Sequence, residues 1–107
     1  MMGCIIARAD FIKNNEAAVK KFLKDYEESV TAANNNADST AALCEKYGIV
    51  PKAAIAKKAL PECNICFVAG KKMKTDLSGY LAVLYGFDKT ATGGKLPGDD
   101  FYYEYEN

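Results

Sequence analysis

The fold is decided by residues 14–33, NNEAAVKKFLKDYEESVTAA, which carry the strongest secondary-structure signal of the chain. Asn14 is the expected N-cap, and Glu16 lies in the first turn, where its charge favours the helix dipole. Apolar side chains then recur three and four positions apart, as on one buried helical face: Val19, Phe22, Leu23, Tyr26, Val30 and Ala33. We therefore expect a helix that ends at Asn34–Asn36, because asparagines favour turns.

A short strand is expected before this helix, over residues 3–8. The run is apolar, contains two β-branched isoleucines and is too short for a helix by itself. One helical turn is expected over residues 10–13. Nothing earlier in the chain could pair with the strand, which favours the interpretation that the chain is a piece of a larger protein.

Three more helices are expected on the C-terminal side, over residues 38–47, 51–60 and 70–86. The first should bury Thr40, Leu43, Cys44 and Tyr47, and the last should bury Met73, Leu77, Tyr80, Leu81 and Leu84.

Glycine and proline set the expected helix boundaries. Gly48 and Gly86 are expected to end helices, Gly48 in the left-handed conformation, each followed by an apolar residue, Ile49 or Phe87, that contacts the cap. Pro51 suits a first helical position, and Pro61 is expected to stop that helix.

Two segments should lack helix. Cys63–Val68 is apolar, rich in strand formers and expected to be extended. Residues 88–107 contain glycines and Pro97 and are expected to form an irregular tail, fastened by its aromatic residues. The predicted fold is therefore a single domain over residues 1–107, helix-dominated α/β, with four to five helices and one or two short strands.

Composition excludes several classes of function. The chain has 107 residues, half of them hydrophobic, and 14 basic residues balance 14 acidic ones, so net charge gives no argument for binding nucleic acid. It has no histidine, which excludes histidine-based triads, general bases and metal ligands. The Gly93-Gly94-Lys95 run lacks the spacing of a phosphate loop. We expect no enzymatic activity, no metal and no cofactor.

Cys63 and Cys66 form the one local motif with known chemistry, a CxxC pair. Such a pair can bind zinc or cycle between dithiol and disulfide. Cys4 and Cys44 are isolated and supply no second pair, and the motif does not open a helix after a strand. We expect these cysteines to be buried as small hydrophobic residues, with thiol-redox and zinc roles as alternatives.

Four segments together resemble the C-terminal part of ABC-transporter substrate-binding proteins of the nitrate, sulfonate and thiamine-precursor type. They are ARADFIKNNEAAVKKFLKDYEESV, CEKYGIVPKAAIAKKALPECNICFVAG, MKTDLSGYLAVLYGFD and GGKLPGDDFYY, and they cover nearly the whole chain. The family tends to have proline where Asn15 stands. The resemblance implies a C-terminal fragment of a two-lobed, type II periplasmic-binding-protein-like fold from a bacterium.

The parent protein, as the resemblance implies, would be anchored outside the membrane, bind a small molecule between its lobes and deliver it to an ABC permease. Cys4 and Arg8, beside the expected hinge, are the candidate ligand-binding residues. This chain lacks a signal peptide, so it is expected in the cytoplasm as expressed, and unpaired strand edges are expected to favour a homo-oligomer. The alternative from another class is a stand-alone helical protein-interaction module.

Overall fold

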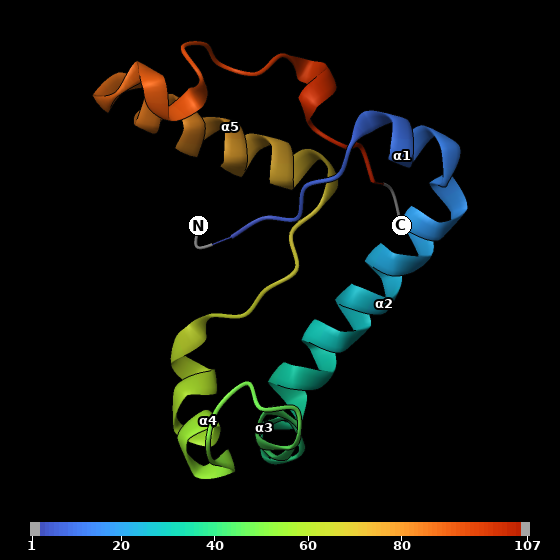
Figure 1. Cartoon of the computed structure of the whole chain (residues 1–107), viewed down its shortest axis with the longest axis vertical. Coiled ribbons are helices and arrows are strands. Elements are labelled where there is room, and N and C mark those ends of the chain that lie inside the picture. Colours follow the sequence, from blue (N-terminus) through green and yellow to red (C-terminus); the bar gives the residue numbers. More distant parts are fainter. Residues whose placement is uncertain (1–2, 106–107) are drawn as a thin grey trace. The chain divides into compact units, whose positions relative to one another are not determined.

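The structure, a computed structural model, describes residues 3–105 and consists of helices joined by turns and irregular segments (Figure 1). In chain order the elements are α1 (Ala9–Asn14), α2 (Glu16–Asn35), α3 (Ala37–Lys46), α4 (Ala53–Ala59), the 3-10 helix η1 (Leu60–Cys63), α5 (Gly70–Phe87), and the 3-10 helices η2 (Lys89–Thr92) and η3 (Asp99–Phe101). None of these elements, which span the described part of the chain, is long and apolar enough to cross a membrane.

The α/β prediction is wrong, because residues 3–105 contain no strand. Residues 3–8 are irregular and exposed, and residues 65–69 are irregular as well. A strand exists only when another strand accepts its backbone hydrogen bonds, and an apolar run by itself cannot supply that partner. The structure is therefore not an α/β fragment of a periplasmic-binding protein. Residues 3–105 also have no strand edge through which the expected homo-oligomer could form.

The described chain divides into two compact units. The α2–α4 unit covers residues 12–67, and the α5 unit combines residues 3–11 with residues 68–105. The expectation of a single domain stays a prediction.

The α2 helix confirms the strongest sequence signal, although its apolar face is less buried than expected. Val30 is buried, whereas Phe22 and Tyr26 are exposed. These two rings stack with centroids 5.9 Å apart, and the Phe67 ring meets Tyr26 edge-on at the same distance. The side-chain amide of Asn34 also donates a hydrogen bond of 2.9 Å to the Ile65 carbonyl, so the segment after η1 is tied to α2.

Two helix boundaries differ from the prediction. Asn15, not Asn14, precedes α2, and only Asn36 interrupts the helix at the three asparagines. The N–H of Asn36 bonds to the Ala32 carbonyl and its own carbonyl accepts from the N–H of Thr40, so this residue ends α2 and begins α3. Asn36 alone is enough to separate the two helices, because its N–H ends α2 and its carbonyl begins α3.

The prolines also act differently from the prediction. Pro51 precedes α4 rather than starting it, and Pro61 does not stop the helical path, since it lies in η1, which follows α4 directly. A proline at the start of a 3-10 helix loses no hydrogen bond, because the first N–H groups of a helix have no partner within it.

The α5 unit is built on an 18-residue helix and the irregular tail that the sequence predicts. Its buried residues include Leu77 of α5 and Tyr102 of the tail. The Lys74 ammonium lies 2.9 Å from an Asp99 carboxylate oxygen, and this hydrogen-bonded contact raises the pKa of Lys74. Tyr102 and the Lys74–Asp99 ion pair thus connect the tail to the helix.

The end of α5 contradicts the predicted glycine cap. The helix continues through Phe87, and Asp88 caps it by donating its N–H to the Leu84 carbonyl at 2.8 Å. Gly86 has no positive φ, and Phe87 is 88% exposed, so it makes no burying contact at the cap.

Candidate protein-interaction surface

The α3 and α4 helices pack against each other, and the buried residue of each is an alanine. Ala41 of α3 is 2% exposed and Ala56 of α4 is 3% exposed. Small side chains allow two helix backbones to approach closely. The fully buried residues of the pair are thus small, and its large apolar residues are more exposed.

The turn after α3 is a Schellman motif. Gly48 has a φ of 69°, its N–H bonds to the Glu45 carbonyl at 3.0 Å, and the N–H of Ile49 bonds to the Cys44 carbonyl at 2.8 Å. The left-handed cap predicted at Gly48 is confirmed. The predicted contact of Ile49 is not, because Ile49 is 72% exposed.

Two polar contacts join α3 to α4. The Glu45 carboxylate accepts a hydrogen bond of 2.7 Å from the N–H of Ala53, the first residue of α4. The Lys57 ammonium of α4 lies 2.6 Å from an Asp38 carboxylate oxygen of α3. The acidic groups on these two helices are thus engaged within the pair.

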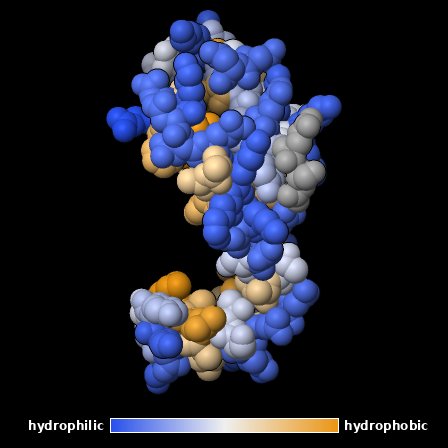
Figure 2. All heavy atoms as spheres, turned by 90° about the vertical axis from the view of Figure 1, so that its right-hand side faces the viewer, coloured by the Kyte–Doolittle hydropathy of each residue, from blue (hydrophilic) through white to orange (hydrophobic). Residues whose placement is uncertain are grey.

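Four large apolar side chains remain exposed on this helix pair and its turn. We name them the α3–α4 surface: Leu43, Tyr47, Ile49 and Ile55. Figure 2 shows hydrophobic side chains, in orange, gathered in the lower group of atoms, where α3 and α4 lie. Leu43 and Tyr47 were predicted to be buried, and that prediction is wrong: Leu43 is 48% and Tyr47 70% exposed, and the buried residue of α3 is Ala41.

Exposed lysines lie next to residues of the α3–α4 surface in the sequence. Lys52 and Lys58 are exposed and form no ion pair with any residue between positions 3 and 105. The Lys46 ammonium lies 5.5 Å from the centroid of the Tyr47 ring, the range of a cation–π contact. Lysines next to the surface residues in sequence therefore carry charges that no ion pair of the described residues neutralises.

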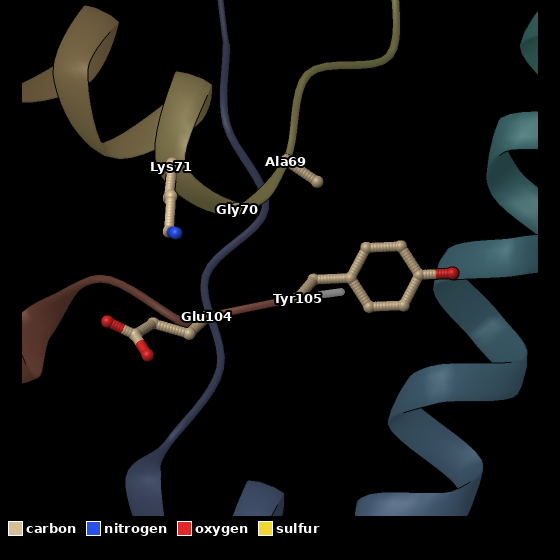
Figure 3. A pocket seen from close by; sticks show the side chains of 5 residues that line it. All are labelled: Ala69, Gly70, Lys71, Glu104 and Tyr105. Atoms are coloured by element: carbon tan, nitrogen blue, oxygen red, sulfur yellow. The ribbon is translucent and has the colours of Figure 1, made fainter. Parts of the chain in front are cut away.

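The predicted ligand-binding residues Cys4 and Arg8 lie in the exposed N-terminal segment. Neither lines the pocket of the α5 unit, which Figure 3 shows. That pocket has a volume of about 220 Å³, below the usual range for drug-sized ligands, and is lined by Ala69, Gly70, Lys71, Glu104 and Tyr105. Its opposite charges, Lys71 and Glu104, leave it without a net charge to select a ligand.

The cysteines are less buried than expected. Cys4, Cys63 and Cys66 are exposed and Cys44 is half-buried, all as free thiols. Between residues 3 and 105, no group of three cysteine or carboxylate side chains could hold a metal ion. The thiol-redox alternative for Cys63 and Cys66 stays a prediction.

Sequence reasoning did not identify the α3–α4 surface. The pattern showed which residues are apolar, and it assigned Leu43 and Tyr47 to a core. Ala41 and Ala56 could have indicated this surface in the sequence. Two helices with alanines between them, joined by a glycine turn, can pack together and leave larger apolar residues exposed.

Comparisons with known proteins give no assignment: no family model, curated protein or solved structure matches this chain.

Proposed function

We propose that the chain is a helical protein-interaction module that binds an acidic, amphipathic helix of a partner protein through the α3–α4 surface. The observation that carries this proposal is the exposure of Leu43, Tyr47, Ile49 and Ile55 on a helix pair whose buried residues are Ala41 and Ala56. Clustered apolar side chains with a polar rim are typical of protein-binding surfaces.

Rigidity favours binding at this surface. The buried alanines, the Schellman turn and the Glu45 to Ala53 hydrogen bond fix α3 and α4 before any partner arrives. A preorganised surface loses little conformational entropy when it binds, so more of the interaction free energy contributes to affinity.

Charge favours an acidic partner. Asp38 and Glu45 are engaged by α4, whereas Lys52 and Lys58 have no acidic partner in the described chain. An amphipathic helix with glutamates beside its apolar face would neutralise these lysines, whereas a basic helix would be repelled.

The receptor role that the resemblance implied stays a prediction. That role required an α/β lobe, and the α/β lobe is the part of the expectation that the helical structure corrects. The interaction module requires only the helices that are present.

The test uses two synthetic helical peptides of about 20 residues with the same leucine face, one with glutamate and one with lysine on the flanks. Fluorescence anisotropy with the whole chain should give a Kd on the order of 10 µM for the acidic peptide and binding at least about tenfold weaker for the basic one. Equal affinity for the two peptides, or no binding of either, would overturn the proposal.

Variants locate the binding. Tyr47→Ser together with Ile49→Ser should weaken binding of the acidic peptide about tenfold or more, because both side chains are at least 70% exposed and free to contact it. The matched control is Val83→Ser, which removes an exposed apolar side chain from α5 and should leave binding unchanged. An equal loss in the control would move the site away from the α3–α4 surface.

A further inference from the structure

Cys63 and Cys66 are two exposed, free thiols that the proposed partner binding does not use. Cys63 is the last residue of η1, and Cys66 follows it after two intervening residues, in an irregular segment. Exposure matters because thiol–disulfide exchange requires a thiolate that can reach the disulfide it attacks. Two accessible thiols this close in the chain can react first with a small disulfide and then with each other.

The backbone between the two cysteines is held to α2. Asn64 adopts the left-handed conformation, with a φ of 49°, and its side-chain amide donates a hydrogen bond of 3.2 Å to the Glu62 carbonyl. The Ile65 carbonyl accepts a hydrogen bond of 2.9 Å from the side-chain amide of Asn34, near the end of α2. The segment that a disulfide would close is therefore tied to α2 through Ile65.

Both neighbours of Cys66 contact α2, whereas Cys66 itself is accessible. Ile65 and Phe67 are half-buried, and the Phe67 ring meets Tyr26 of α2 edge-on, with centroids 5.9 Å apart. Cys66, between them, is exposed. The contacts with α2 therefore fix the backbone around Cys66 without covering its thiol.

A disulfide between these cysteines requires a tighter turn than the segment has. The Cα atoms of two bridged cysteines lie about 4.4–6.8 Å apart, whereas three residues of extended chain span about 10 Å. Residues 65–69 contain neither a turn nor a bend, so closing the ring has to bend the chain at Ile65. That bend redirects the Ile65 carbonyl, to which Asn34 donates its hydrogen bond.

We propose that Cys63 and Cys66 form a reversible disulfide that competes with the hydrogen bond between Asn34 and Ile65. The oxidant is a small disulfide such as glutathione disulfide. One cysteine thiolate attacks a sulfur of this oxidant and releases one glutathione thiolate. The second cysteine thiolate attacks the resulting mixed disulfide, forms the Cys63–Cys66 bond and releases the second glutathione. The protein loses two electrons and two protons, and both pass to the two glutathione molecules.

The consequence is a redox-dependent attachment of residues 65–67 to α2. These residues end the α2–α4 unit. Oxidation loosens them from α2, and reduction restores the hydrogen bond from Asn34. The proposal does not depend on the partner binding, which uses the α3–α4 surface.

The first test incubates the whole chain with mixtures of reduced and oxidised glutathione, followed by acid quenching, alkylation and tryptic mapping. Both cysteines lie in the tryptic peptide of residues 59–71, which contains no other cysteine. We expect this peptide to lose two hydrogens, to an extent that does not depend on protein concentration. A peptide that keeps both thiols at every glutathione ratio, carries only glutathione adducts, or is bridged to Cys4 or Cys44 would overturn the proposal.

Asn34→Ala tests the competition. If the hydrogen bond is present only in the reduced chain, removing its donor should raise the equilibrium constant for disulfide formation about fivefold, the factor that one net hydrogen bond supplies. Asn35→Ala is the matched control, because this exposed neighbour makes no side-chain hydrogen bond within residues 3–105, and it should leave the constant unchanged. Equal constants for Asn34→Ala and the natural chain would overturn the competition.

NMR of the side-chain amides reports the release directly. On oxidation the Asn34 side-chain amide signals should move towards those of a solvent-exposed amide, whereas the Asn35 signals should stay in place. Cys66→Ser cannot close the ring, so the Asn34 signals of this variant should stay in place under the same oxidant. Unmoved Asn34 signals in the fully bridged natural chain would contradict the proposal.

Discussion

The Glu45 carboxylate caps a helix other than its own: one oxygen of this α3 residue accepts a hydrogen bond of 2.7 Å from the N–H of Ala53 in α4. Lys52, the residue before α4, makes no side-chain cap, so Glu45 supplies the acceptor and the negative charge that a helix N-terminus favours. A single side chain thus links the geometry of the turn to the start of the next helix.

Glu45→Ala should lower the local stability of the α3–α4 pair by about 1 kcal/mol, because the first N–H of α4 loses its acceptor. Glu45→Gln keeps an oxygen acceptor and should cost less. Amide hydrogen exchange of residues 53–56 measures the change, and Glu62→Ala, on the exposed η1, is the control. Equal protection in Glu45→Ala and the natural chain would show that the hydrogen bond does not stabilise α4.

Ala41→Leu should destabilise the same pair by about 1–3 kcal/mol, since the added carbons have no space at a position that is 2% exposed. Ala42→Leu makes the identical change at the exposed neighbouring position and should have little effect. Hydrogen exchange across α3 and α4 compares the two variants. Similar effects of both changes would mean that the alanine contact does not determine the helix spacing.

Gly70→Ala should release the tail from α5. Gly70 has a φ of 57°, and an added Cβ would lie 2.6 Å from the backbone oxygen of Tyr105, so the cost should be about 1–3 kcal/mol. Gly86→Ala, with nothing within 4 Å and no positive φ, should instead stabilise α5 by about 0.5–1 kcal/mol in dilute solution. Hydrogen exchange at residues 99–105 reports the release, and unchanged protection there would contradict it.

Asp88 should titrate below its ordinary range. Hydrogen bonds from the Thr90 hydroxyl at 2.7 Å and from the Thr90 N–H at 2.8 Å favour the ionised carboxylate and lower the pKa of Asp88. Because the folded-state pKa is depressed, the contribution of these two hydrogen bonds, at the start of η2, to stability is present above about pH 4 and is lost as the pH falls further.

Carboxyl NMR titration measures this shift. Thr90→Val removes the first and larger cause and should move the pKa of Asp88 back towards its ordinary value. Thr92→Val is the control, because the Thr92 hydroxyl bonds to the Lys89 carbonyl and not to Asp88. An Asp88 pKa that does not respond to Thr90→Val would contradict the assigned cause.

Local signals predicted the helices better than they predicted burial. The periodicity located α2 and α3 to within about two residues, and Gly48 ends α3 as its conformational freedom suggests. These features depend on neighbouring residues alone. The irregular tail is another such case, since glycines and Pro97 prevent a long element whatever packs nearby.

The predictions of strands and of burial that were wrong share a different cause. The segment over residues 3–8 has strand-forming residues, but a strand requires a second segment, and the described residues 3–105 provide none. In the same way, periodicity gives the apolar face of α3 but not the residue that fills its contact with α4. The α3–α4 surface was missed because exposure depends on what covers a side chain, which is a property of the whole fold and its partners.

The small cores also link the amount of this protein in a cell to its binding partners. The buried hydrophobic residues are Val30, Ala41 and Ala56 in the α2–α4 unit, and Leu77 and Tyr102 in the α5 unit. Small cores leave a small free energy of unfolding, and a ligand that binds only the folded state raises that free energy by mass action. Proteases act on opened chains, so a chain without its partner should be degraded faster than a bound one. The abundance of the protein would then follow the concentration of whatever it binds.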